Sequence, residues 1–341
     1  MKKISLISYQ DSGVGFYRIY QPGRVLRREG LVKDARSFPF SGTGQGNFYE
    51  MDDRTYMEVT KDTDVIWATL PYTEERMIKL LNLRKHWNCK LVIDIDDNLY
   101  AVPHNNVEQV KTAKLMPAIQ ASIAMADGVT VSVPRLQDVY KNLNKEFYVN
   151  NNGLDFDIWD KLKKTNKKHE GIRIGWRGAS GHFDDLAIVK PVLKELQKNY
   201  PVTIVTLGEK MDEEYETHHW VGMLEYPQKL ASMDLDIAVV PLVDSAYNRC
   251  KSNLCYLEFS ALKVPTVLSP VENQKDHPTL YAKSKYEWYD QLEKLIKSSA
   301  LRQELTQKNY DFVKENYNIT QQVHPLNDWM NKLKRRTDLE P

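Results

Sequence analysis

The side chains best suited to chemistry stand in short clusters beside apolar runs. Asp94, Asp96 and Asp97 lie in and just after the run LVIDI. On an extended strand Asp94 and Asp96 share one face, and Asp97 points to the other. Such carboxylates favour a metal ion, sugar hydroxyls, general-base chemistry or the capping of a following helix. His104 comes soon after them as a candidate acceptor-side group, with an incidental loop histidine as the alternative.

Two glycine-containing turns follow apolar runs. The first contains Gly13 and Gly15 and leads to Arg18, and the second, GWRGASGH, contains Arg177 and Gly178. Glycine lets backbone N–H groups approach a ligand closely, and arginine adds a fixed cationic fork. The second turn therefore predicts a phosphate site, with a surface turn that carries an exposed arginine as the alternative. The first lacks the third glycine of GxGxxG, so a plain tight turn is its alternative.

A third cluster of candidate residues lies at the start of, and within, a helix predicted over 252–262. Lys251 stands before it, Ser252 is a natural N-cap, and Glu258 lies in an otherwise apolar stretch. A diphosphate at this helix start would meet the helix dipole and an ammonium group. A buried carboxylate can accept hydrogen bonds from both hydroxyls of a ribose. An exposed helix glutamate is the alternative for Glu258.

Short apolar runs alternate with amphipathic segments along the chain. Strands are predicted over 4–8, 65–69, 91–95, 128–132, 147–149, 172–176, 202–207, 236–241 and 266–269, with a short edge at Val221. Helices are predicted over 22–30, 73–87, 116–126, 134–143, 186–199, 227–233, 252–262 and 286–317, and a glycine-rich loop over 41–47. This alternation predicts parallel βαβ units.

The expected fold class is α/β, with two Rossmann-like doubly wound domains facing across a cleft. The first is expected over 1–160 and the second over 171–315. The lysine-rich stretch 161–170 predicts a linker, with a solvated helix face as the alternative. A C-terminal helix over 316–341 is expected to pack back on the first domain. Ligands of such sheets bind at the carboxyl ends of the strands, so the site is expected in the cleft.

Composition narrows the function classes. The chain has 47 Lys+Arg against 46 Asp+Glu, a net charge of +1, which argues against a uniformly basic nucleic-acid binder. Three cysteines without a CxxC motif argue against a disulfide scaffold and favour a reducing compartment. The apolar runs are too short for a signal peptide or a membrane span. A cytoplasmic protein is therefore expected, with peripheral membrane attachment as an open alternative.

The second half resembles the nucleotide-binding domain of GT-B glycosyltransferases, closest to family 4-like retaining enzymes of phage and bacterial type. The resemblance rests on IGWRG, TIVTLG, WVG, MDLDIAVVPL and KSNLCYLEFSALKVPTVLS, and in the first half on ADGVTVSVPRLQDVY and VNNNGLD. It implies transfer of a hexosyl or pentosyl group from a nucleotide-sugar, a UDP-sugar first of all, to an acceptor hydroxyl with retention. It also implies no tightly bound cofactor and no catalytic metal.

The resemblance implies roles for individual residues. The catalytic set is Arg177, Lys251, Asp96 and Asp97. The donor-binding set is Gly13, Gly15, Arg18, Gly178, Lys210, Ser252, Asn253 and Glu258. Asp94 and His104 belong to the acceptor side. The sequence departs from the family pattern at Cys250, where a second glutamate is usual, and in IDIDD, which replaces a His-Asp pair.

Two other functions remain open at this stage: a GT-B nucleotide-sugar epimerase and a non-catalytic nucleotide or sugar binder. The acceptor is equally open among a glycan, a protein, a lipid-linked sugar and a hydroxylated base in phage DNA. The DNA option rests on a basic stretch with interleaved tyrosines, for which a solvated helix face is the alternative. That stretch contains Tyr17, Arg18, Tyr20, Arg24, Arg27, Arg28 and Lys33.

Overall fold

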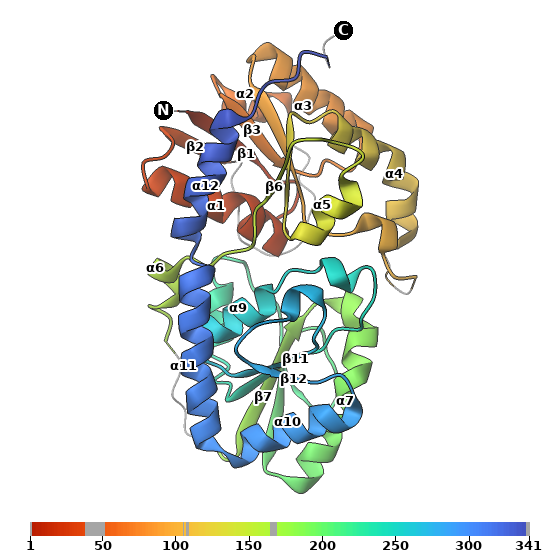
Figure 1. The fold of residues 1–341 in the computed structure, drawn as a ribbon, viewed down its shortest axis with the longest axis vertical. Coiled ribbons are helices and arrows are strands. Elements are labelled where there is room, and N and C mark those ends of the chain that lie inside the picture. Colours follow the sequence, from red (N-terminus) through yellow and green to blue (C-terminus); the bar gives the residue numbers. More distant parts are fainter. Residues whose placement is uncertain (1, 38–51, 105, 107–108, 164–168, 339–341) are drawn as a thin grey trace. The chain divides into compact units, whose positions relative to one another are not determined.

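The computed structural model describes residues 2–37, 52–104, 106, 109–163 and 169–338 (Figure 1). The chain divides into two compact units. Unit 1 comprises Met1–Gly153, Cys250–Ser252 and Ile319–Pro341, and unit 2 comprises Leu154–Arg249 and Asn253–Asn318. The predicted loop over 41–47 and residues 164–168 of the predicted linker lie outside the described residues. The domain boundaries expected from the sequence remain predictions.

Unit 1 contains a parallel sheet in the order β2-β1-β3-β4-β5-β6. Its strands are β1 Lys3–Ile7, β2 Asp34–Ser37, β3 Val65–Thr69, β4 Lys90–Ile95, β5 Gly128–Val131 and β6 Phe147–Val149. The chain leaves β1 toward β2 on one side and returns to β3 on the other. The switch point of this sheet is therefore between β1 and β3, where a crevice at the strand ends is expected.

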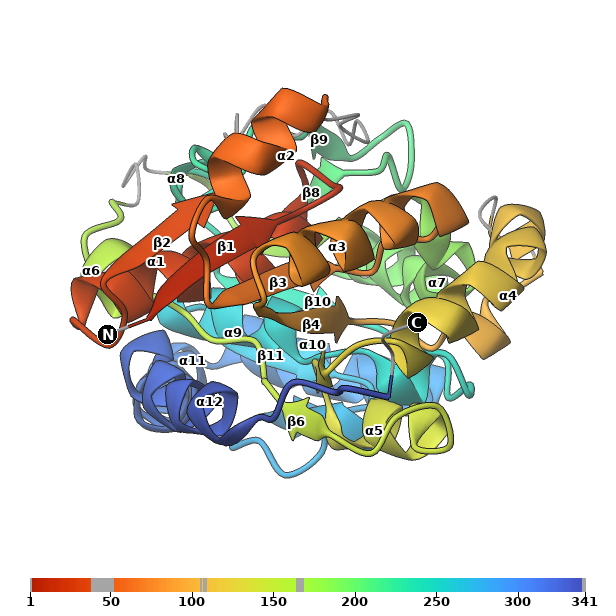
Figure 2. The ribbon, with the colours of Figure 1, turned by 90° about the horizontal axis from the view of Figure 1, so that it is seen from above.

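The helices of unit 1 cover both faces of its sheet. They are the π-helical turn η1 Gly15–Tyr20, α1 Gln21–Arg28, α2 Asp53–Thr60, α3 Glu74–His86, η2 Leu99–Ala101, α4 Gln109–Ala124, α5 Pro134–Tyr140 and α12 Ile319–Lys332. Val65 and Trp67 pack with α1 and α12, whereas Ile66 and Ala68 pack with α3 and α4. Figure 2 shows α3 and α4 toward the right of this view and α12 at its lower left. A strand buried on both faces explains the unbroken apolar run VIWAT.

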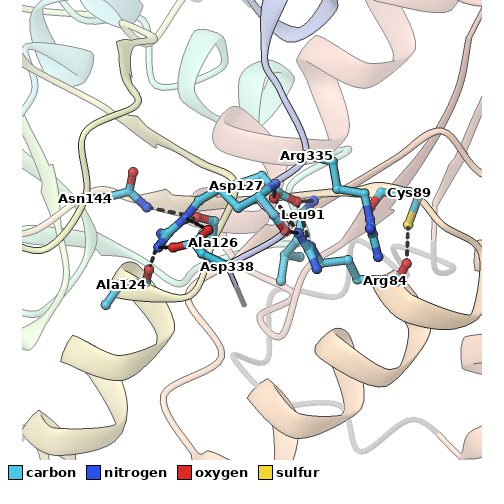
Figure 3. A network of polar contacts seen from close by, with 10 residues as sticks. Arg84, Cys89, Leu91, Ala124, Ala126, Asp127, Asn144, Arg335 and Asp338 are labelled. Carbon is cyan, nitrogen blue, oxygen red and sulfur yellow. Dashed lines mark hydrogen bonds and ion pairs between the residues drawn. The ribbon is translucent and has the colours of Figure 1, made fainter. Parts of the chain in front are cut away.

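The C-terminal segment is fastened to unit 1 by a buried ion pair (Figure 3). Arg84 donates two hydrogen bonds to Asp127, from Nε at 2.8 Å and from Nη2 at 2.7 Å. The same carboxylate accepts from the backbone N–H groups of Leu91 and Arg336. Arg84 Nη2 also donates to the carbonyl oxygen of Arg336 at 2.5 Å. One buried acid thus ties α3, β4 and the C-terminal segment together.

Unit 2 contains a second parallel sheet, in the order β12-β11-β10-β7-β8-β9. Its strands are β7 Ile172–Gly178, β8 Val202–Gly208, β9 Glu216–His218, β10 Ile237–Val240, β11 Thr266–Leu268 and β12 Leu280–Tyr281. Its helices are α6 Phe156–Trp159, η3 Ser180–His182, α7 Phe183–Asn199, α8 Tyr226–Ala231, α9 Leu254–Ala261, η5 Glu272–Gln274, α10 Lys285–Lys297 and α11 Ser299–Asn316, and η4 Asn248–Cys250 precedes α9. Counted within the unit, this is the strand order of the Rossmann fold, with the switch point between β7 and β10.

The predicted α/β class with two Rossmann-like parallel sheets is confirmed. Some elements differ from the prediction. The edge strand is β9 rather than a segment at Val221, which is irregular, and β2, β12 and α2 were not predicted. Helix α4 begins at Gln109, seven residues before the predicted start, and η1 continues directly into α1.

Candidate functional site

A narrow pocket lies at the switch point of unit 1. Its walls come from the segments that follow β1, β3 and β4. They are Gln10, Val14, Thr69, Leu70, Tyr72, Asp94, Ile95, Asp96, Asp97 and Leu99. Tyr72 has a φ of 59°, a left-handed conformation that a non-glycine residue adopts only when its surroundings enforce it. The structure therefore gathers the predicted carboxylates into one polar pocket.

Arg18 and Asp94 form a buried ion pair at the base of this region. Arg18 Nε and Nη2 donate to the two oxygens of Asp94 at 3.0 and 2.7 Å, and the side chains are 2% and 1% exposed. Arg18 Nη1 donates to the carbonyl of Asn150 and to Asn152 Oδ1. Thr130 Oγ1 donates to Asp94 at 2.6 Å. Both side chains are thus held within the protein, and their predicted roles toward donor and acceptor remain predictions.

Asp96 and Asp97 also line this pocket. Burial raises the pKa of Asp96 to about 7, and the like charges of Asp97 and Asp94 act in the same direction. Asp97 accepts from Lys251 Nζ at 2.8 Å. Its backbone carbonyl accepts from the hydroxyl of Tyr140. Asp96 is therefore the carboxyl group here whose charge changes near neutral pH.

The glycines of the first turn have different surroundings. A Cβ on Gly15 would stand 2.1 Å from the carbonyl oxygen of Gln10 and 2.4 Å from Ser8 Oγ, so a side chain cannot fit without movement. A Cβ on Gly13 would meet nothing within 4 Å. Close packing of the turn therefore explains Gly15, and a ligand-binding role for either glycine remains a prediction.

The segment before α9 is divided between the units. Ser252 Oγ, in unit 1, accepts from Asn152 Nδ2 at 2.8 Å. The N-cap of α9 is Asn253 rather than the predicted Ser252, and its side chain makes no capping bond. Instead Asn253 Nδ2 donates to His277 Nε2 at 3.2 Å. Burial lowers the pKa of His277 to about 4, so this imidazole is a neutral acceptor.

Unit 2 buries a carboxylate near the carboxyl end of its sheet. Glu258, on α9, is 1% exposed, and its Oε2 lies 2.5 Å from Arg177 Nη2, on β7. The hydroxyl of Tyr226, at the start of α8, donates to the same oxygen at 2.8 Å. Burial raises the pKa of Tyr226 well above its usual range, so it stays a donor. The structure thus brings the predicted residues Arg177 and Glu258 into contact.

Other predicted site residues take no part in these contacts. Gly178 ends β7, where a Cβ would stand 2.3 Å from the Trp176 ring. Lys210 follows β8 and is half-exposed, paired with Glu213. His104 is exposed, and it makes no polar contact among the described residues. Their roles remain predictions.

Two functional candidates of unit 2 were missed in the sequence. One is Tyr226, whose partner lies 32 residues away. The other is His182, whose Nδ1 lies 2.7 Å from Asp185 Oδ2 in the turn after β7. The spacing of His182 and Asp185 across a helix start was a signal, because residues three apart face each other there.

The basic stretch considered for DNA is smaller on the surface than its sequence suggests. Arg18 and Tyr17 are buried, whereas Arg24, Arg27 and Arg28 are exposed on or beside α1. The prediction that Arg18 and Tyr17 belong to a basic surface patch is therefore wrong. In the described part of the chain, no helix combines the length and apolar composition needed to cross a bilayer. The described residues also hold no group of three His, Cys, Asp or Glu side chains placed to bind a metal ion.

No protein-family model matches the chain, and no curated protein matches its sequence. Solved structures match its fold. Alpha-glucosyltransferase (AGT) in complex with UDP has a TM-score of 0.68 at 9% identity, over 97% of this chain and 100% of that one. Anabaena HepE in complex with UDP-glucose has a TM-score of 0.67 at 11% identity, over 98% and 100%. TarM has a TM-score of 0.60 at 15% identity over 81% of this chain, which spans 57% of its length. At these identities the likeness is one of fold.

Proposed function

We propose that this chain is a glycosyltransferase that moves a sugar from a nucleotide-sugar, a UDP-sugar first of all, to an acceptor hydroxyl. The observation that supports this best is the Glu258 carboxylate, buried beside the switch point of a Rossmann sheet and held there by Arg177 and Tyr226. The similarity in fold to AGT bound to UDP and to HepE bound to UDP-glucose adds to the support.

The proposed donor site uses the contacts of unit 2. Tyr226 and Arg177 fix the Glu258 carboxylate through Oε2, and ribose hydroxyls donate to the carboxylate. Arg177 is partly exposed and brings a positive charge to the end of β7. A charge placed there stabilises the diphosphate as negative charge grows on it during departure. The predicted parts of Lys251 and Lys210 in binding phosphate belong to the same proposal.

The proposed acceptor site is the pocket at the end of β1, β3 and β4. Asp96 carries the raised pKa, so in its ionised form it accepts the proton of an acceptor hydroxyl, and Asp97 stands beside it. Asp94, bound to Arg18, orients this wall of the pocket. Retention at the sugar is proposed from the family resemblance, and the proton coupling of the new anomeric centre measures it.

Donor binding is tested first. Calorimetry of the full chain with UDP, ADP, GDP and CMP identifies the base, and each matching nucleotide-sugar is then offered with candidate acceptors. We expect UDP to bind and its sugar to be transferred. Glu258→Gln should weaken nucleotide binding roughly 10-fold or more, because hydrogen bonds to a charged group are the strong ones. Glu304→Gln is the matched control, because Glu304 lies in an exposed ion pair on α11. This variant should leave nucleotide binding unchanged.

Other outcomes identify the rival functions. A wild-type chain that binds none of these nucleotides contradicts the proposal. Binding without sugar release to any acceptor indicates a non-catalytic binder. A change of the sugar's configuration without transfer indicates an epimerase. A salt-dependent shift on duplex DNA that Arg24→Met reduces would favour DNA among the acceptors, and transfer to an oligosaccharide would favour a glycan.

A further inference from the structure

The pocket at the carboxyl ends of β1, β3 and β4 in unit 1 is very small. Its volume is about 10 Å³. That is roughly the room that a single water molecule needs, and a sugar ring is many times larger. The pocket therefore admits one hydroxyl group of an acceptor, while the ring that carries this group stays outside.

One carboxyl group in this pocket is available to such a hydroxyl. Asp94 is paired with Arg18, and Asp97 is paired with Lys251. Within the part of the chain that the structure describes, the side chain of Asp96 takes part in no ion pair and no hydrogen bond. A carboxylate is a strong hydrogen-bond acceptor, so Asp96 can receive the hydrogen bond of a ligand hydroxyl.

Tyr72 lines the side of the pocket that follows β3, and its backbone is strained there. Its φ is 59°, and across it the N–H of Thr73 donates to the carbonyl of Pro71 at 2.7 Å. A three-residue turn with a left-handed centre is rare for a residue that has a side chain. The side chain of Thr73 then caps α3 by accepting from the N–H of Arg76. The turn is thus anchored to α3, and it holds Tyr72 at the pocket wall.

Hydrogen bonds also fix the other walls. The carbonyl of Gln10 accepts from Ser8 Oγ at 2.8 Å. The N–H of Leu99 donates to the hydroxyl of Tyr140 at 2.9 Å, and this hydroxyl donates to the carbonyl of Asp97 at 3.0 Å. Walls that are held in this way keep the pocket narrow when a ligand enters.

The size and the charge of the pocket select the hydroxyl that fits. The carbon of a primary hydroxyl carries one further carbon, whereas that of a secondary hydroxyl carries two, which widen the group just behind its oxygen. The negative charge of ionised Asp96 disfavours an acceptor rich in phosphate, such as a nucleic acid. We propose that the acceptor is a neutral carbohydrate whose primary hydroxyl, the hydroxymethyl group of a hexose, enters this pocket, and that Tyr72 excludes secondary hydroxyls. This inference rests on the proposed function.

The test compares acceptors that differ only in this group. Methyl β-glucoside carries a hydroxymethyl group on its ring, and methyl β-xyloside is the same molecule without it. With a UDP-sugar as donor, the wild-type chain should transfer to the glucoside roughly 10-fold faster or more. The new bond should lie at the primary oxygen, as read by NMR of the product. Tyr72→Gly should reduce the preference to about 3-fold or less, because glycine opens the wall and adopts a positive φ without strain.

Asn88→Gly is the matched control. Asn88 also has a positive φ, 48°, but it is exposed between α3 and β4, at the amino end of β4 and thus at the opposite edge of the sheet. This variant relieves the same kind of backbone strain and should keep the preference for the glucoside. Tyr72→Phe keeps the ring and should keep the preference as well, which separates the size of the wall from the tyrosine hydroxyl.

A second measurement needs neither a variant that folds nor a bound nucleotide. In the wild-type chain, the ¹³C signal of the Asp96 carboxyl group should move when methyl β-glucoside is added and stay unmoved with methyl β-xyloside. The signal is assigned by its loss in Asp96→Asn.

The outcomes separate the two proposals. A wild-type chain that binds no nucleotide overturns the proposed function, and this inference with it. A chain that binds UDP overturns this inference alone if it transfers its sugar to neither glycoside or to both equally, or if the Asp96 signal stays still with both. Transfer to a hydroxylated base in duplex DNA, and to neither glycoside, would put a nucleic acid in place of the carbohydrate. An unchanged preference in Tyr72→Gly overturns the part assigned to Tyr72.

Discussion

Replacing Arg18 by methionine separates two roles for this residue. The sequence predicts a contact with the donor, whereas the structure pairs Arg18 with Asp94 inside unit 1. Methionine keeps much of the volume and removes the charge. Among the described residues, the Thr130 hydroxyl then remains the one side-chain donor to Asp94, and the bonds to Asn150 and Asn152 are also lost.

The expected cost follows from the burial of both partners. Removing one member of a buried ion pair costs about 3–5 kcal/mol, because the other charge stays desolvated. For a domain of this size, each 1 kcal/mol lowers the melting temperature by about 2–4 °C. Unit 1 should therefore melt roughly 6–20 °C lower. The double variant Arg18→Met with Asp94→Leu should recover most of the loss, since an apolar pair of similar volume carries no uncompensated charge.

Hydrogen exchange read by mass spectrometry is the suitable assay, because peptides of β1 and β4 report on unit 1 and peptides of β7 and β8 report on unit 2. Arg24→Met, on the exposed face of α1, is the control and should stay within about 0.5 kcal/mol of wild type. If Arg18→Met leaves the exchange of β4 unchanged and weakens UDP binding 10-fold, the reasoning fails and the donor contact is supported instead.

Three further changes test other contacts. Asp127→Ala leaves the Arg84 guanidinium buried without its acid and should cost unit 1 about 3–5 kcal/mol, measured by urea denaturation. The pKa of Asp96 rises to about 7 on folding, so the folded chain keeps a proton that the unfolded chain releases near pH 4. Stability should therefore fall as pH rises from about 4 to about 7, and Asp96→Asn should flatten this dependence. Tyr226→Phe removes one donor from Glu258 Oε2 and should weaken nucleotide binding roughly 3- to 10-fold, measured by calorimetry.

Each change has a control and a contrary outcome. Asp138→Ala, exposed on α5, should leave stability unchanged, and a loss below 1 kcal/mol for Asp127→Ala would contradict the buried ion pair. A stability of unit 1 that is independent of pH between 4 and 7 would contradict the pKa of Asp96. Tyr286→Phe, 86% exposed on α10, is the control for Tyr226→Phe. Equal nucleotide binding by both tyrosine variants would show that the Tyr226 hydroxyl does not position Glu258.

Apolar runs predicted most of the two sheets because burial on both faces leaves a plain signal. VIWAT and LVIDI became β3 and β4 as expected. β2 escaped because DARS contains no apolar run; its strand exists through pairing with β1, in which Lys3 stands opposite Asp34. Tertiary pairing, rather than local preference, decides such an edge.

The sequence also indicated which residue types gather at the strand ends, but not how their charges pair. Arg18 and Asp94 were placed on the donor and acceptor sides, yet they bind each other across 76 residues. Lys251 and Asp97 are 154 residues apart and likewise form an ion pair. Parallel strands bring their carboxyl ends to one edge, so proximity was predictable. The particular partner depends on register and side-chain reach, which spacing along the chain does not determine.

The inability to predict the partner of a charged side chain from the sequence matters most for buried acids. Glu258 was expected to be buried because its helix is otherwise apolar, and it is 1% exposed. A carboxylate removed from water costs several kcal/mol unless donors surround it, so its burial implies partners without naming them. Arg177 comes from β7 and Tyr226 from α8, while Asp185 draws its donors from the segment after β10. In both cases the acid sits on a helix and its donors come from other elements that end or begin at the same sheet edge. The fold, and not the local sequence, therefore determines which groups these acids hold in place.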